Sequence, residues 1–172
     1  PDSIVELGGF GHCSSLKKVK LPAHIKEIYG FSYCISLENI EIPYGVESIG
    51  NYAFEGCTAL REINIPNTVK NIGYYSFSGC TSLEYIDIPN SVTTIDGYAF
   101  DSCTALKRVN IPRNIKTINS SVFQYCNSLQ SIEIPHGIEL IKSSAFNCCF
   151  KIETVYVPGS VKTIESGAFT NC

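Results

Sequence analysis

The stretch that decides the fold is residues 49–66, which read Ile-Gly-Asn-Tyr-Ala-Phe-Glu-Gly-Cys-Thr-Ala-Leu-Arg-Glu-Ile-Asn-Ile-Pro. Its order of Phe, Cys, aliphatic residues and Pro returns along the whole chain, with Phe three residues before each Cys and Leu or Ile three residues after it. The repeated cysteines are 21 residues apart once and 23 residues apart thereafter: Cys13, Cys34, Cys57, Cys80, Cys103, Cys126, Cys149 and Cys172. A fixed period of this length is typical of repeat proteins.

Each repeat contains two segments that favour extended backbone. The first, Leu-x-x-Ile-x-Ile, is β-branched and alternates at its end, which predicts a short strand. The Pro that follows has no N–H group and ends the strand. The second segment is Val-x-x-Ile, as at Val69–Ile72. Between repeats, the stretch Tyr-Ala-Phe-Glu-Gly-Cys is too short for a regular helix, and we expect it to form one short helical turn.

One such repeat cannot bury enough apolar surface to fold alone, so neighbouring coils must cover each other and share hydrogen bonds between strands. We therefore predict a single domain over residues 1–172 with about seven and a half repeats, and expect it to be a fragment of a longer protein. The first two repeats have two residues fewer before the Phe, with Gly9 and Gly30 in place of Ala. A tighter corner is expected there.

The motif Ala-Phe-x-x-Cys followed by Leu-x-x-Ile-x-Ile-Pro resembles the BspA-like class of leucine-rich repeats, over the whole chain. The resemblance implies a right-handed leucine-rich-repeat solenoid, mainly β, with one short helical turn per 23-residue repeat. It also implies the roles of the family, whose members are mostly surface proteins of mucosal bacteria and parasitic protists and are associated with adhesion to host matrix proteins and other cells.

This sequence departs from the usual leucine-rich repeat, which carries a ladder of Asn after the strand. The corresponding positions here are mixed: His24, Gly45, Thr68, Ser91, Asn114, Gly137 and Ser160. Since no ladder of Asn exists, the backbone groups at that bend must find other partners.

The composition limits the classes of function. Hydrophobic residues make up 44% and charged residues 17% of the 172 residues, as in an ordered globular chain. The net charge of −3 gives no reason to expect a nucleic-acid partner. No uninterrupted apolar run approaches the ~18–20 residues that cross a bilayer, so we expect no membrane insertion by this segment.

The nine cysteines suggest zinc or disulfides at first sight. Zinc needs thiolates that converge on one point, whereas this repeat spreads them along an axis. Parallel side chains in successive coils also hold their Cβ atoms too far apart for a disulfide. We predict a column of buried thiols beside the Phe residues. Cys148 lies outside the register, so we expect it to be more exposed and to be the best candidate for a reactive or pairing thiol.

No arrangement of residues predicts catalysis. The three histidines occupy unrelated repeat positions, and no glycine-rich phosphate loop is present. We also expect no dry pocket in so short a solenoid, and such a pocket is needed to shift the pKa of a catalytic carboxylate. The sequence therefore predicts no catalytic residues, no metal site, no cofactor and no enzymatic activity.

The candidate ligand-binding residues lie four, five and seven residues after each Cys, on the outward side of the predicted strands. These positions differ in every repeat, while the core positions hardly change. The candidates are Lys17, Lys18, Lys20, Arg61, Tyr85, Asp87, Lys107, Arg108 and Tyr156. Charges of opposite sign tend to face each other in neighbouring repeats, for example Lys20 with Glu41 and Asp87 with Arg108. Two interpretations remain open: a self-compensating soluble surface, or a face that binds protein or glycan.

Two minor signals remain. Tyr52, Tyr75 and Tyr98 recur with the repeat, beside Tyr74, and we favour a packing role over a binding role for them. Residues 119–121, Asn-Ser-Ser, match the acceptor sequence for N-glycosylation, a pattern that is common by chance.

The leading hypothesis is a non-enzymatic binding module of a cell-surface or secreted adhesin-like protein. Its partner would be a host matrix or cell-surface protein, with glycans as a second class of partner. The alternative is an intracellular scaffold component, cytoplasmic or cytoskeletal, whose partners are neighbouring subunits of an assembly. Unpaired cysteines fit the reducing compartment of that alternative.

Overall fold

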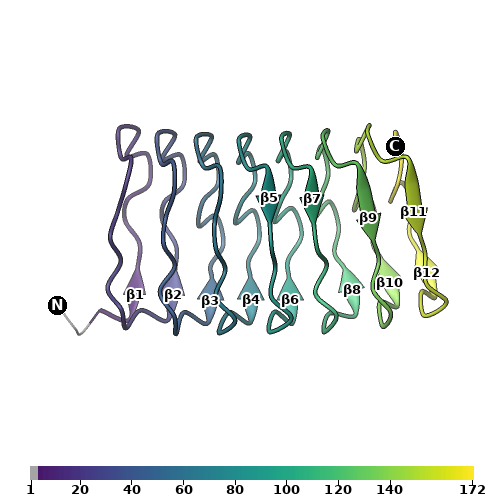
Figure 1. Cartoon of the computed structure of the whole chain (residues 1–172), viewed down its shortest axis with the longest axis horizontal. Helices are drawn as coiled ribbons and strands as arrows, with labels where there is room; N and C mark the ends of the chain where they lie inside the picture. The colour runs from purple at the N-terminus through teal and green to yellow at the C-terminus, as the bar shows by residue number, and fades with distance from the viewer. Residues whose placement is uncertain (1–3) are drawn as a thin grey trace.

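The computed structural model describes residues 4–172, which wind into a stack of about seven parallel coils (Figure 1). Each coil is flattened, so that one extended segment lies on a back face and another on a front face. The back sheet contains β1 Glu6–Leu7, β2 Glu27–Ile28, β3 Ser48–Ile49, β4 Asn71–Ile72, β6 Thr94–Ile95, β8 Thr117–Ile118, β10 Leu140–Ile141 and β12 Thr163–Ile164. The front strands are β5 Tyr85–Ile86, β7 Arg108–Val109, β9 Ser131–Glu133 and β11 Thr154–Tyr156.

The back sheet comes from the Val-x-x-Ile segments and is parallel throughout. Strands β1, β2, β3, β4 and β6 pair in order, and β8, β10 and β12 form a second group. The register joins equivalent positions of successive repeats, as in Ile28 with Ile49 and Ile49 with Ile72. These isoleucines are fully buried, because alternate residues of a strand point to opposite sides.

The back sheet is interrupted between β6 and β8, which are not paired. Val122 occupies a position that holds Ala or Ser in the other full-length repeats, and it is 1% exposed. We attribute the interruption to its extra methyl groups, since added volume in a packed core displaces the backbone. The Asn119 side chain spans the gap by donating to the Ile95 carbonyl at 2.7 Å, which engages the amide nitrogen of the glycosylation acceptor sequence.

The front sheet comes from the Leu-x-x-Ile-x-Ile segments, as predicted, but its ladder is broken into pieces. Strand β5 pairs with β7 and β9 pairs with β11. Single bridges join Glu41 to Asn64 and Asn64 to Asp87. Within residues 4–172, no strand pairing links β7 to β9.

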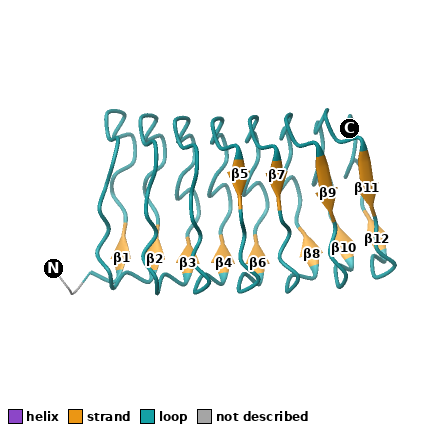
Figure 2. Ribbon diagram, in the orientation of Figure 1, coloured by secondary structure: helices purple, strands orange, loops and turns teal. Residues whose placement is uncertain are grey.

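The predicted helical turn is wrong: no helix occurs in the described part of the chain (Figure 2). The corner instead consists of hydrogen-bonded turns, in which Tyr52 and Gly56 adopt left-handed φ angles of 57° and 65°. A left-handed residue stops the run of right-handed angles that a helix needs. The N–H groups also bond to the next coil, as Phe54 does to the Ser76 carbonyl at 2.7 Å. Residues 4–172 accordingly contain no helix long and apolar enough to span a membrane.

The tighter corner predicted for the first two repeats is present. Gly9 and Gly30 have φ angles of 88° and 77°, which residues with a side chain rarely adopt. A Cβ atom on Gly30 would lie 2.5 Å from the backbone nitrogen of Gly9. Only glycine therefore allows the two short coils to approach each other here.

The core is a set of columns that run along the stack. Eight phenylalanines, from Phe10 to Phe169, stack with ring centroids 5.0 to 5.7 Å apart. The thiols of the repeated cysteines lie beside them, as predicted, and each buried one donates to the Phe carbonyl of the preceding repeat, as Cys57 does to Phe31 at 3.1 Å. Burial raises the pKa of Cys57 to about 12. Such thiols are inert packing groups at neutral pH.

Candidate binding face

The candidate site is the front face, which we define as the outward side chains of the front segments. Of the predicted residues, Lys107 is half-buried and the rest are exposed: Lys17, Lys18, Lys20, Arg61, Tyr85, Asp87, Arg108 and Tyr156. They point outward because the alternating Leu and Ile residues of the same segments fill the core. The structure does not gather all of them, because they are distributed along the length of the stack.

A groove of about 630 Å³, which we call the central groove, brings three of the predicted residues together. It lies over β5, β7 and β9, where the front ladder is interrupted. Ile86, Val109 and Ile111 line it together with more polar residues. Those are Tyr85, Asp87, Asn90, Arg108, Asn110, Arg113, Ser131, Glu133 and Pro135.

The sequence analysis missed several groove residues, above all Arg113. This residue follows the Pro of its repeat, at a position occupied elsewhere by Ala23, Tyr44, Asn67, Asn90, His136 and Gly159. That position varies as freely as the strand positions, and this variability was the available signal. Glu133 belonged to the variable set but was not chosen as a candidate.

A second hollow of about 500 Å³ lies between the first two front segments. It places Lys18 and Lys20 on one side and Asn39 and Glu41 on the other. Here too no strand pairing joins the two segments within the described residues. The second hollow therefore lies where two coils are not joined by a front ladder, and the central groove does so on its β7–β9 side only.

The predicted compensation of charges across the front face is largely not realised. Among residues 4–172, the ion pairs are Lys26 with Glu47, Lys107 with Glu84, and Lys162 with Glu139. Neither Lys20 with Glu41 nor Asp87 with Arg108 forms one. The charged groups around both hollows are thus left without an ionic partner in the described residues.

Lys107 is the exception on the front face, because its ammonium group is held by Glu84. The hydrogen bond lowers the pKa of Glu84 and raises that of Lys107. The same ammonium group lies 5.7 Å from the centre of the Tyr85 ring, a cation–π distance. Lys107 therefore helps to position Tyr85 at the rim of the central groove. Its charge is already paired with Glu84 and is not free to bind a ligand.

Asn110 lines the central groove, but its side-chain amide is hydrogen-bonded to the backbone of the neighbouring coil. Its side-chain amide donates to the Ile88 carbonyl and accepts from the Ile88 N–H, both at 2.7 Å. Nearby, Asn114 donates to the Asn90 carbonyl at 2.6 Å. These side chains take the place of backbone ladder bonds between the two coils.

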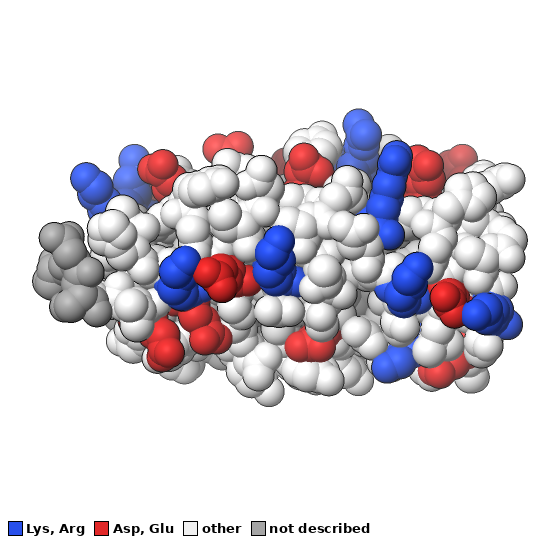
Figure 3. Space-filling view, turned by 90° about the horizontal axis from the view of Figure 1, so that it is seen from below, with Lys and Arg blue, Asp and Glu red and all other residues white. Residues whose placement is uncertain are grey.

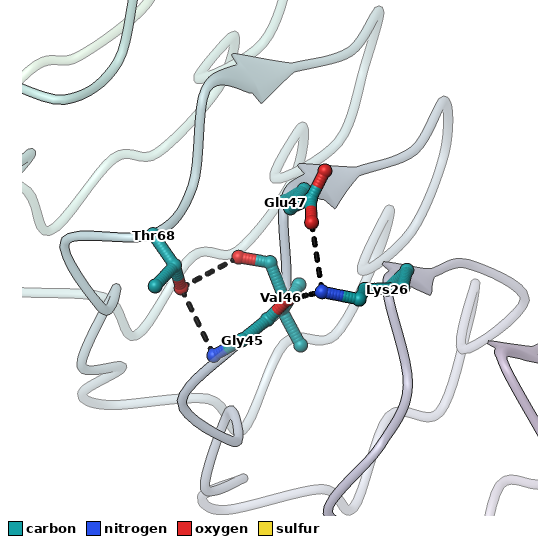
Figure 4. A network of polar contacts seen from close by, with 5 residues as sticks. All are labelled: Lys26, Gly45, Val46, Glu47 and Thr68. Atoms are coloured by element: carbon teal, nitrogen blue, oxygen red, sulfur yellow. Dashed lines mark hydrogen bonds and ion pairs between the residues drawn. The ribbon is translucent and has the colours of Figure 1, made fainter.

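The bend after the front segments finds the partners that the absent Asn ladder would supply. Figure 4 shows Thr68 accepting a hydrogen bond from Gly45 N at 3.1 Å and donating to the Val46 carbonyl at 2.8 Å. In a later repeat, Ser160 accepts from Gly137 N at 3.1 Å. A side-chain hydroxyl of the following coil thus forms the hydrogen bonds that the backbone of the preceding coil needs at this bend.

The expected exposure of Cys148 is wrong, since this residue is only 8% exposed. It occupies the left-handed position before the repeated Cys, with a φ of 61°. The following coil covers it: Thr170 accepts from its N–H at 2.8 Å, and the Asn171 amide lies 3.5 Å from its sulfur. Its role as a reactive or pairing thiol stays a prediction.

The tyrosine ladder is a stack. The rings of Tyr52, Tyr75 and Tyr98 lie nearly parallel, with centroids 5.4 and 4.7 Å apart. Their faces contact one another, which agrees with the predicted packing role. All three residues have left-handed φ angles of 54° to 60°.

A charged row along the start of the back strands escaped the sequence analysis. It occupies the position thirteen residues after each Cys: Lys26, Glu47, Lys70, Thr93, Lys116, Glu139 and Lys162. Figure 3 shows blue and red side chains alternating in a row along this side of the stack. Two of the three ion pairs lie in this row, so its charges are largely satisfied within the chain.

The parallel coils, the columns of Leu, Ile and Phe, and the strands that repeat every 23 residues define a leucine-rich-repeat solenoid. Six copies of the BspA type leucine rich repeat region match the chain, over residues 3–69, 27–133 and 49–172. The chain belongs to this family.

Solved structures agree with this assignment. A leucine-rich repeat protein from Bacteroides ovatus is 32% identical, with a TM-score of 0.89 over 94% of this chain. The T. pallidum leucine rich repeat protein is 31% identical, with a TM-score of 0.84 over 88% of this chain and 75% of its own. The pneumococcal vaccine antigen PcpA is 24% identical over 91% of this chain and 38% of its own, with a TM-score of 0.64, and shows the fold alone. The chain spans 43% of the B. ovatus protein. The comparison with curated proteins gave no match.

Proposed function

We propose that this chain is a non-enzymatic binding module of a cell-surface or secreted, adhesin-like protein, and that it recognises its partner through the front face. The observation that carries the proposal is the contrast between an almost invariant core and a front face whose charges stay unpaired around two hollows. A surface kept only for solubility would be expected to compensate its charges locally.

The relatives support the location and the general role. A leucine rich cell surface protein from Faecalibacterium prausnitzii and the pneumococcal vaccine antigen PcpA share the fold. A solenoid of this kind offers a long exposed surface on which a protein partner can be bound. We expect the partner to be a matrix or cell-surface protein.

The test is binding to an array of fibronectin, laminin and collagen and to epithelial cells. The front variant carries Lys17→Glu, Lys18→Glu and Arg108→Glu; the control variant carries Lys70→Glu, Lys116→Glu and Lys142→Glu. Both triple changes alter the net charge equally and avoid the three ion pairs. We expect at least a tenfold loss of binding for the front variant and less than a twofold loss for the control. Equal losses, or none, would refute recognition by this face.

The second candidate is an intracellular scaffold, which the unpaired cysteines favour. Burial reduces this support, because it protects seven of the nine thiols and raises the pKa of Cys57 and Cys149 to about 12, so buried thiols would stay reduced in an oxidising compartment as well; Cys13 and Cys172 are exposed. Failure to bind the array and the cells, together with self-association in sedimentation experiments, would favour the scaffold.

A further inference from the structure

The central groove lies across a break in the front ladder, since β5 pairs with β7 but β7 does not pair with β9 in the described residues. The Asn110 side chain also replaces backbone contacts with Ile88. In a repeat protein, a local departure from the repeated pattern costs stability and is a marker of function. The groove thus combines a break in the ladder with a side-chain bridge between two coils.

We propose that the central groove binds a neutral saccharide of one to three residues. This inference rests on the proposed function and assigns a ligand class to one part of the front face. The groove has a volume of about 630 Å³, within the range of small-ligand sites.

The charges of the groove favour an uncharged ligand. Arg108 and Arg113 face Asp87 and Glu133 around the same space, and none of the four forms an ion pair in the described residues. The two positive and two negative groups cancel, so an acidic or basic ligand would meet repulsion as well as attraction.

The hydrogen-bonding groups match sugar hydroxyls. Guanidinium groups only donate, and ionised carboxylates only accept. A hydroxyl does both, so a ring that carries several of them can satisfy both kinds of group at once. Hydrogen bonds with an ionised partner are also stronger than neutral ones.

The apolar part of the groove matches the C–H face of a sugar ring. Tyr85 is 55% exposed at the rim, with Lys107 near its ring. Ile86 and Ile111 also border the groove, but they are only 4% and 6% exposed and belong to the core. The exposed ring of Tyr85 is therefore the surface on which a pyranose can stack.

The same features argue against a peptide in this groove. Peptides that add to a sheet need a free strand edge, whereas β7 and β9 lie inside the stack (Figure 1). Protein hot spots centre on a desolvated apolar anchor pocket, whereas half of the residues that line the groove are charged or amide residues.

The experiment is NMR titration of the folded chain with a panel of neutral saccharides. The panel contains mono- to trisaccharides of galactose, glucose, mannose and N-acetylglucosamine, with sialyllactose as the acidic comparison. We expect at least one neutral member to bind, with amide shifts at Tyr85, Arg108 and Ser131. Because the ligand is uncharged, its affinity should change less than twofold between 50 and 500 mM salt, as a rough criterion.

Matched variants locate the site. Tyr85→Ser and Arg113→Ala should each weaken binding at least tenfold. Tyr44→Ser and Lys70→Ala, which change exposed residues outside the groove, should leave it within twofold. Thermal unfolding of each variant verifies that the fold is kept.

Three results would overturn the saccharide site: no binding of any neutral member, shifts confined to other surfaces, or binding of sialyllactose alone. If the front variant still loses binding to cells in that case, the proposed function stands and only the ligand class fails. If cells and saccharides are both bound normally by the front and groove variants, both proposals fail.

Discussion

The back and front faces of the solenoid are built from the same coils but differ in regularity. The back face has a five-stranded and a three-stranded parallel group, and its charged row is held by two ion pairs. The front face has two separate strand pairs, isolated bridges, and hollows where the ladder is absent. The difference indicates that the back face maintains the stack, while the front face is free to vary and to bind.

The largest expected effect comes from the core on which both faces depend. Phe77 is fully buried and stacks on Phe54 and Phe100. Phe77→Ala should reduce the free energy of unfolding by roughly 3–5 kcal/mol, through lost contacts and the cavity left behind. Urea denaturation measures this effect, and hydrogen exchange should show lost protection in both faces. Loss in one face only would mean that the faces do not share this core.

The next effect separates side-chain bridging from backbone pairing on the front face. Asn110→Ala removes both hydrogen bonds to the Ile88 backbone, and we expect a cost of roughly 1–3 kcal/mol in unfolding free energy. Asn64→Ala is the control, because Asn64 is exposed at the same repeat position and has its own backbone bridges. Its cost should stay below about 0.5 kcal/mol. Similar costs for both variants would show that the Asn110 amide has no special role.

A smaller effect tests the interruption of the back sheet. If Val122 separates β6 from β8, Val122→Ala should let the strands pair and should cost less than about 0.5 kcal/mol, well below an ordinary core truncation. Amide exchange at Thr117 and Ile118 should become slower. Ala145→Val is the reverse change in a regular coil and should destabilise by about 1–3 kcal/mol. A full core penalty for Val122→Ala, with unchanged exchange, would contradict this explanation.

The smallest effect concerns the charged row. The hydrogen bond from Lys26, and its charge, lower the pKa of Glu47, with Lys70 as the last contributor. Lys26→Gln should therefore raise this pKa, and Lys70→Gln should raise it less. Since the pKa is depressed in the folded chain, the associated stabilisation is present at neutral pH and is lost as the pH falls through the folded value. Carbon-detected NMR titration of the Glu47 carboxyl measures both shifts; a larger response to Lys70→Gln would contradict the assignment.

Much of the fold could be predicted because the same residue types recur at a fixed spacing in every repeat. The recurrence of Phe and Cys predicted a column of thiols beside the Phe residues, and the alternation in Leu-x-x-Ile-x-Ile predicted the inward and outward sides. The helical turn was wrong because the left-handed angles at Tyr52 and Gly56, and the bonds that run to the next coil, are set by neighbours. Cys148 was misplaced for the same reason, since the following coil covers it.

The candidate site could be predicted only in part. Variability marked Tyr85, Asp87 and Arg108, but nothing in a single repeat indicated that they would share a groove with Arg113 and Glu133. The opposite charges at equivalent positions of neighbouring repeats predicted that these side chains would form ion pairs. An ion pair also requires the two charged groups to lie close together, which the sequence does not show. Lys20 with Glu41, and Asp87 with Arg108, line hollows of the front face without forming an ion pair in the described residues.

The sequence by itself determined the period, the core columns and the outward positions, because burial follows from which residues recur at fixed spacing. The tertiary structure alone decided which neighbouring coils pair, where the front face opens into grooves, and which charges find partners. Those outcomes depend on the fit of one coil against the next, where the two extra methyl groups of one valine, or one side-chain amide, can prevent or replace a ladder of backbone hydrogen bonds.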